Sequence, residues 1–287
     1  MTPRTGSTEP SGSVRPRAAG TETGEQRIAA AFGAAAGRAA LMPYLMGAFP
    51  DLDTSAAIGE AYADAGADLV ELGVPFSDPL ADGPVIHAAA TRALAAGATL
   101  PGVLDVAKRI AERIPVVLMC YANPILARGL ERFTDELATA GVSGLIVPDM
   151  PLEESAAVRE ACDAAGLALV PLVAPTTSDD RLAAITGQAR GFVYTVSLTG
   201  TTGERAGVDG SLGSVLARAK AHSPVPVAVG FGISTPEQAA HAAAAGADGV
   251  IVGSRLVRAA AEAVDTGGDP GAAVAEHVAA LAGALRR

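Results

Sequence analysis

Short apolar runs alternate with longer alanine-rich stretches along most of this chain. The apolar runs are rich in Val, Ile and Leu, which is typical of strands covered on both faces, and the stretches between them have the apolar spacing of helices. We expect eight strands, over residues 40–46, 69–72, 116–120, 144–147, 168–172, 191–196, 226–229 and 249–252.

A similar sequence recurs where helices are expected to end and strands to begin. It reads Ala-Gly-Ala-Asp at residues 65–68 and again at residues 245–248, and related glycines stand at Gly141 and Gly166. Glycine suits the left-handed position that ends a helix. Eight strand–helix units in roughly 250 residues predict an α/β fold, the (β/α)8 TIM barrel.

A doubly wound open sheet uses the same local signals. The chain lacks a Gly-x-Gly-x-x-Gly turn after its first strand, which argues against that alternative. Extra helical sequence also fits a barrel, at residues 84–96 ahead of 100–113 and at residues 254–263 ahead of 272–285.

The N-terminal segment differs from the rest of the chain. Residues 1–24 are rich in Ser, Thr, Gly, Pro and Arg, which predicts a disordered extension. Residues 25–38 carry Ile28 and Phe32 at helical spacing and predict a short helix that plugs the bottom of the barrel. No linker separates the later units, so residues 25–287 are expected to form one catalytic domain.

Composition narrows the class of protein. Of the 287 residues, 49% are hydrophobic and 18% are charged, which indicates a globular chain. The net charge of −10 argues against binding to nucleic acid or to anionic membranes. No apolar stretch is long enough to span a membrane, and the N-terminus lacks the apolar core of a signal peptide, so we expect a cytoplasmic protein.

Neither the cysteines nor the histidines have the spacing of a metal site. Cys120 and Cys162 read as core thiols, and the four histidines are scattered singly. We therefore expect no catalytic metal.

Residues 68–84 carry the clearest chemical signal. Glu71 interrupts a buried apolar run, and burial raises the pKa of a carboxyl group into the range that a general acid or base needs. Asp82 lies in the following loop, which Pro75, Pro79 and Pro84 stiffen, so both carboxyl groups can face one cavity. Alternatively, Glu71 is a structural charge and Asp82 serves only the turn.

Two late strand–helix junctions predict a phosphate site. Gly230-Phe-Gly232 precedes a helix capped by Thr235, and residues 253–254 open the next helix. Glycines let a ligand approach the backbone, and the free amides of a helix N-terminus attract anions. The alternative is that both segments are only tight turns.

Two further features point to substrate binding. The polar, glycine-rich loop at 198–213 suits a lid, although a surface loop would have the same composition. Tyr121 and Tyr194, at or within predicted strands, can hold a carboxylate through their hydroxyl groups or can simply be satisfied core aromatics.

The string from Glu71 to Gly83, Glu-Leu-Gly-Val-Pro-Phe-Ser-Asp-Pro-Leu-Ala-Asp-Gly, resembles the signature of the tryptophan synthase alpha subunit. The resemblance extends from about residue 24 to the C-terminus, with further landmarks in the family's order at residues 43–44, 121–124, 148–151, 197–203, 230–233 and 253–254. It implies a (β/α)8 barrel that cleaves indole-3-glycerol phosphate to indole and glyceraldehyde 3-phosphate. It also implies a pyridoxal-phosphate beta subunit that receives the indole in an alpha2beta2 complex, and no cofactor in this chain.

The resemblance assigns a role to each site residue. Glu71 would transfer both protons, and Asp82 would accept a hydrogen bond from the indole N–H. The resemblance implies that the phosphate binds Gly203, Gly232, Gly253 and Ser254. It implies that the rest of the substrate contacts Tyr44, Met119, Tyr121, Ile146, Leu172, Tyr194 and Phe231.

Two departures from the family's pattern are small. Residues 47–50 read Gly-Ala-Phe-Pro where many relatives have another order, and His87 stands where Gln is frequent. Two alternative functions exist. Loss of either acid would favour a non-catalytic activating subunit, but both acids are present. The second alternative is a free-standing lyase that works without a beta subunit, and the sequence discriminates poorly between it and the main function.

Overall fold

A closed ring of parallel strands forms the centre of the structure. The computed structural model describes residues 22–196, 212–230 and 232–286. Within them the sheet order is β5-β4-β3-β2-β1-β9-β8-β7-β6, and every pairing is parallel. Because β5 and β6 are consecutive pieces of one chain segment, the sheet closes into an eight-stranded barrel, which confirms the predicted fold. The strands are β1 (Ala40–Met46), β2 (Val70–Gly73), β3 (Val116–Met119), β4 (Gly144–Ile146), β5 (Ala168–Leu169), β6 (Leu172–Val173), β7 (Val193–Val196), β8 (Val227–Gly230) and β9 (Gly249–Val252).

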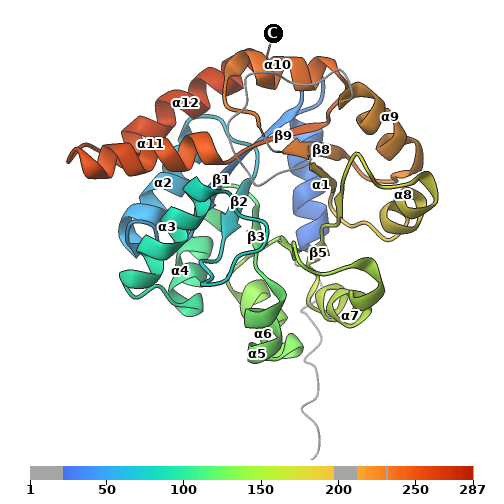
Figure 1. Ribbon diagram of the computed structural model, residues 1–287, viewed down its shortest axis with the longest axis horizontal. Coiled ribbons are helices and arrows are strands. Elements are labelled where there is room, and N and C mark those ends of the chain that lie inside the picture. The colour runs from blue at the N-terminus through green and yellow to red at the C-terminus, as the bar shows by residue number, and fades with distance from the viewer. Residues whose placement is uncertain (1–21, 197–211, 231, 287) are drawn as a thin grey trace, which may run out of the picture.

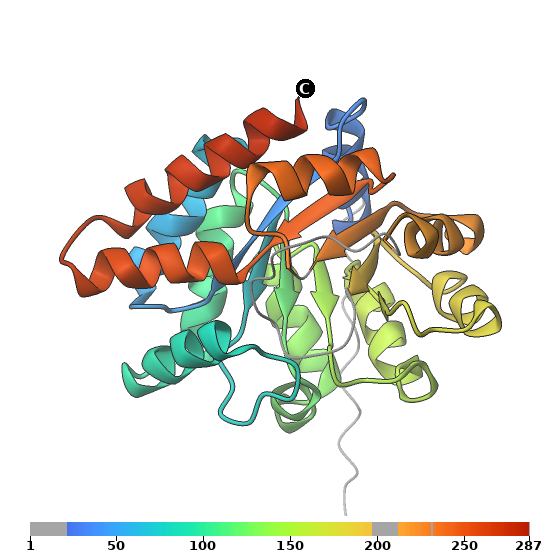
Figure 2. The same cartoon turned by 45° about the horizontal axis from the view of Figure 1, so that its top comes forward.

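Helices surround the barrel (Figure 1), and the turned view shows the sheet curled inside them (Figure 2). They are α1 (Gly24–Ala34), α2 (Leu52–Asp64), α3 (Pro84–Ala95), α4 (Leu100–Ala111), α5 (Ala122–Arg128), α6 (Leu130–Thr139), η1 (Leu152–Glu154), α7 (Ala156–Ala165), α8 (Asp179–Thr186), α9 (Leu212–His222), α10 (Pro236–Ala244), α11 (Ser254–Asp265) and α12 (Pro270–Leu285). The extra helices expected from the sequence are α3 and α11. In the described part of the chain, no helix is long and apolar enough to cross a membrane.

The fifth strand differs from its prediction. Residues 168–172 were expected to form one strand, but the structure divides them into β5 and β6. Pro171 has no N–H to donate, so the regular ladder is interrupted there. The Val170 N–H still donates to Leu145 on β4, and the Pro171 carbonyl accepts from Tyr194 on β7, both at 2.9 Å. The prediction of a continuous strand was therefore wrong, whereas the closure of the barrel does not depend on it.

Helix α1 closes the amino end of the barrel, as predicted. Thr23 caps it in a capping box with Gln26, so the helix starts one residue before its expected position. Arg27 donates to the carbonyls of Gly141 (2.5 Å) and Ala111 (2.8 Å), both of which precede strands. The fully buried Ile28 packs into the barrel interior. The helix ends at Ala34 rather than near residue 38, ahead of Gly37, which has a φ of +93°.

The repeated glycine junctions adopt the predicted backbone. Gly66, Gly141, Gly166 and Gly246 all have positive φ, between 71° and 101°. The two Ala-Gly-Ala-Asp copies also share a second function that the pattern did not predict. The Asp68 carboxylate accepts from the N–H of Leu41, and the Asp248 carboxylate accepts from the N–H of Val227, both at 2.8 Å. Each aspartate thus fixes the start of the strand next to its own.

Candidate active site

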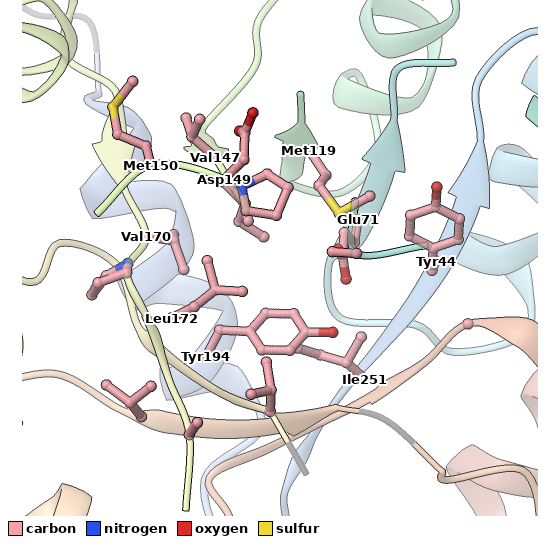
Figure 3. A pocket seen from close by; sticks show the side chains of 18 of the residues that line it. Tyr44, Glu71, Met119, Val147, Asp149, Met150, Val170, Leu172, Tyr194 and Ile251 are labelled. Atoms are coloured by element: carbon pink, nitrogen blue, oxygen red, sulfur yellow. The ribbon is translucent and has the colours of Figure 1, made fainter. Parts of the chain in front are cut away.

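A cavity of about 870 Å³ opens at the carboxyl ends of the strands. Its wall brings together residues from most of the barrel, and Figure 3 shows the side chains that project into it. Among the residues predicted to form the site, the cavity is lined by Tyr44, Glu71, Asp82, Met119, Ile146, Leu172, Tyr194, Gly232, Gly253 and Ser254. Gly203 and Phe231 lie outside the described residues, as does most of the predicted lid.

Glu71 presents an acidic group from the middle of the sheet. It lies on β2, paired with Tyr44 on β1 and Val117 on β3, and its residue surface is 5% exposed. Burial, followed by the nearby negative charge of Asp82, raises the pKa of the Glu71 carboxyl to about 8. At neutral pH this carboxyl group therefore holds a proton that it can deliver into the cavity.

Asp82 is held in place by Tyr121. The Tyr121 hydroxyl donates to Asp82 Oδ1 at 2.8 Å and accepts from the Ala81 N–H at 3.0 Å. The Tyr121 ring stacks on Phe76, with ring centroids 5.3 Å apart. Burial raises the pKa of Asp82, while the Tyr121 hydrogen bond and the charge of His87 lower it. Tyr121 does not line the cavity itself. Binding a carboxylate through its hydroxyl is one of the two roles predicted for Tyr121. The carboxylate that it binds is the side chain of Asp82 in the protein itself.

The predicted phosphate corner has the expected local structure. Gly232 has a φ of +79°, Gly253 precedes α11, and Ser254 is its first residue, so the free amides of this helix lie at the cavity wall. The neighbouring helix α10 begins with the capping box predicted for Thr235 and Gln238, and Pro236 follows the cap.

Another part of the cavity wall is apolar. Met119, Ile146 and Leu172 line it as predicted, and Val170 and Ile251 extend it. In Figure 3 the Tyr194 ring lies beside Leu172, its register partner on β6. This surface is suited to a flat aromatic ring.

Proteins of similar sequence and structure identify the family to which this chain belongs. Residues 31–284 match the family model described as the tryptophan synthase alpha chain. The chain belongs to this family. The tryptophan synthase alpha chain of Prochlorococcus marinus (strain MIT 9313) is 52% identical over 226 residues, which cover 78% of this chain and 82% of that protein. The alpha chain of Synechococcus elongatus is 53% identical over 223 residues, covering 77% and 84%.

Solved structures of the family superpose on the barrel. A chain of tryptophan synthase from Mycobacterium tuberculosis matches with a TM-score of 0.84 and 38% identity, covering 91% of this chain and 98% of that one. The tryptophan synthase alpha chain from Legionella pneumophila subsp. pneumophila matches with a TM-score of 0.82 and 35% identity, covering 91% and 97%.

Asp149 is a cavity residue for which the sequence predicted no role. It lines the cavity, and its Oδ1 accepts from the Ala122 N–H at 2.9 Å, so it caps the start of α5. The available signal was the Pro148-Asp-Met-Pro151 landmark, which contributed to the resemblance without a residue-level assignment. The cavity also reaches Arg159 on α7 and Arg181 on α8, for which the sequence held no signal.

The described residues contain no group of three or more His, Cys, Asp or Glu side chains arranged to hold a metal ion. Cys120 and Cys162 are buried free thiols, as predicted for core positions.

Proposed function

We propose that Glu71 and Asp82 carry out the cleavage of indole-3-glycerol phosphate to indole and glyceraldehyde 3-phosphate. This is the carbon–carbon lyase reaction of the alpha chain in tryptophan biosynthesis. One observation carries the assignment: a buried carboxyl group with a pKa raised to about 8 shares one cavity with a second carboxyl group fixed by a tyrosine.

The raised pKa of Glu71 fits the order of proton transfers. The protonated carboxyl group delivers a proton to the ring carbon that carries the glycerol chain, and positive charge develops on the ring nitrogen. Asp82 accepts a hydrogen bond from that N–H and stabilises the charge. The Glu71 carboxylate then takes the proton of the hydroxyl group next to the ring, the carbon–carbon bond breaks, and its electron pair returns to the ring. Glu71 ends as it began, so the protons balance.

The two remaining walls orient the substrate. The phosphate fits the corner formed by Gly232, Gly253 and Ser254, with Gly203 as a further amide implied by the family resemblance. The indole ring fits the apolar wall of Met119, Ile146 and Leu172, and Phe231 is expected to complete it. Both placements use backbone amides and apolar contact, so this chain's own residues supply the binding without a cofactor.

A beta subunit that holds pyridoxal phosphate is the proposed partner, in an alpha2beta2 complex. Support comes from the carboxyl-end face of the barrel, where Leu80 is 80% exposed and Leu126 is 58% exposed. Both residues follow strands next to the cavity, Leu80 after β2 and Leu126 after β3. These two leucines offer apolar surface near the cavity for contact with a partner subunit.

The test is indole release from indole-3-glycerol phosphate by the purified chain, with and without a beta subunit. Glu71→Gln and Asp82→Asn should each lower kcat by about 10² to 10⁴-fold. Glu60→Gln is the matched control, because Glu60 pairs with Arg109 on the exposed outside of the barrel. Unchanged turnover in Glu71→Gln would refute the assignment. High activity of the chain alone with no stimulation by a beta subunit would instead favour a free-standing lyase.

A further inference from the structure

Tyr44 carries a hydroxyl group into the candidate active site, and the substrate contact expected for this residue assigns no function to that hydroxyl. Tyr44 on β1 is the register partner of Glu71 on β2, so both side chains project from the same face of the sheet into the barrel. Figure 3 shows the two side chains next to each other. Tyr44 is 4% exposed, so its hydroxyl group lies in the buried part of the cavity wall.

Two glycines define how the Tyr44 side chain lies. A Cβ added at Gly73, two residues beyond Glu71, would overlap the Tyr44 hydroxyl, so the tip of the ring rests directly on this glycine. A Cβ added at Gly253 would lie 3.5 Å from Tyr44 Cβ. The side chain therefore extends from the proposed phosphate corner to the neighbourhood of Glu71, and the proposed function places the reacting part of the substrate between the same two points.

Tyr44 Oη and Glu71 Oε2 are buried and have no hydrogen-bond partner among the residues that the structure describes. Burial, then the charges of Asp82 and Glu71, raises the pKa of Tyr44 well above its ordinary value, so the hydroxyl keeps its proton and can donate. An ionised Glu71 can only accept. Both atoms lack a protein partner, so a substrate alcohol group that reaches both would accept from Tyr44 and donate to Glu71.

We propose that Tyr44 donates a hydrogen bond to the substrate hydroxyl whose proton Glu71 removes. The proposal rests on the proposed function. In this step the Glu71 carboxylate takes the O–H proton, the oxygen forms the carbonyl of the aldehyde product, and the carbon–carbon bond to the ring breaks with its electron pair returning to the ring. Negative charge gathers on the oxygen as the proton leaves, and the Tyr44 hydroxyl stabilises it without giving up its own proton. Tyr44 is then a catalytic residue of the reaction as well as part of the cavity wall.

The first test is Tyr44→Phe, which removes the hydroxyl and keeps the ring. We expect kcat for indole release to fall about 10- to 100-fold, somewhat less than for a main oxyanion donor, with KM changed by less than about threefold. Urea unfolding should show a variant at least as stable as the wild type, because a buried hydroxyl without a protein partner is lost. A purely structural hydroxyl would give the opposite result, a loss of stability with kcat retained.

Tyr62→Phe is the matched control. Tyr62 is equally buried but lies outside the cavity, and its hydroxyl donates to the backbone carbonyl of Tyr44 at 3.1 Å. This variant should lose stability and keep kcat within about threefold of the wild type. An equal loss of kcat in both variants would assign the effect to packing around Tyr44 and would overturn the proposal.

A substrate analogue provides the second test. In the analogue, hydrogen replaces the hydroxyl next to the ring, so the wild type must bind it with the Tyr44 hydroxyl unmatched. Calorimetry should show Tyr44→Phe binding this analogue at least as tightly as the wild type does. Retention of kcat within about threefold in Tyr44→Phe, or analogue affinity that falls in proportion to kcat, would overturn the role of Tyr44. Failure of the wild type to release indole would instead reject the proposed function.

Discussion

The Tyr121 hydroxyl bridges Asp82 Oδ1 and the backbone N–H of Ala81, so one side chain on the β3 side of the barrel fixes the acid-bearing loop that follows β2. Removing this hydroxyl in Tyr121→Phe should lower kcat/KM for indole release by about tenfold, since Asp82 loses its orientation. The pKa of Asp82 should rise further, because the hydrogen bond from Tyr121 lowers it.

Steady-state kinetics over a range of pH would measure both effects. Tyr62→Phe again serves as the control that removes a buried hydroxyl elsewhere. A Tyr121→Phe enzyme with an unaltered kcat/KM would show that the loop holds Asp82 without help.

Glu71 should make the protein less stable as the pH rises. The carboxyl ionises near its ordinary pKa of 4.5 in the unfolded chain and at about 8 in the folded protein. Between these values the folded state holds a proton that the unfolded state has lost, so the free energy of unfolding falls from about pH 5 to about pH 8 and then levels. The contribution is on the order of a few kcal/mol.

Urea unfolding of the wild type and of Glu71→Gln between pH 5 and pH 9 would test this. The glutamine variant has no such proton, so its advantage over the wild type should grow through this range. A constant difference between the two proteins would contradict the buried, protonated state of Glu71.

Gly73 is predicted to be essential for the position of Tyr44. A Cβ at Gly73 would overlap the Tyr44 hydroxyl and crowd its rigid ring, so Gly73→Ala should move the ring. We expect a loss of about 1–3 kcal/mol in the free energy of unfolding and at least about a tenfold fall in kcat. Gly33→Ala is the matched control: Gly33 lies in α1 with open space around its Cβ position, so alanine there should be neutral or stabilising by up to about 1 kcal/mol. Equal activity of the two variants would argue against the crowding.

Ile28 should matter for stability and not for chemistry. Its side chain is fully buried beneath the barrel interior, and the Cβ position of Gly191 lies 3.0 Å from its Cδ1. Ile28→Ala should lower the free energy of unfolding by about 2–5 kcal/mol through the cavity that it leaves. Indole release measured under stable conditions should keep its wild-type kcat, and a large fall in kcat would show that α1 shapes the active site.

The sequence predicted the barrel because each strand is a local apolar run and several helices end at a glycine with positive φ. The division of the fifth strand had a local signal, Pro171, which has no N–H for the ladder; the change of hydrogen-bond partner from β4 to β7 at this point depends on the fold. The start of each strand also depends on contacts between segments, such as the Asp68 carboxylate on the Leu41 N–H.

The same limit applies to the site. Glu71 was predictable because a charge in an apolar strand stands out locally. The pairing of Tyr121 with Asp82 joins residues 39 positions apart, and the sequence offered Tyr121 and Tyr194 equally for such a role. The hydroxyl of Tyr44 was overlooked because only the register of β1 and β2 shows that it lies beside Glu71. Asp149 was overlooked because an aspartate between prolines also fits an ordinary turn.

Helix α1 closes the amino end of the barrel, and this determines the route by which the substrate enters and the product leaves. Along the barrel axis, Ile28 and Phe32 block one direction, and Phe32 is itself backed by Phe192 at 5.9 Å between ring centroids. Under the proposed function, indole formed at Glu71 therefore cannot leave through the centre of the barrel. It leaves toward the carboxyl ends of the strands, past the place where the substrate arrived. The substrate enters and the product leaves through the same opening. A protein that docks over this opening would therefore both close it and receive the indole.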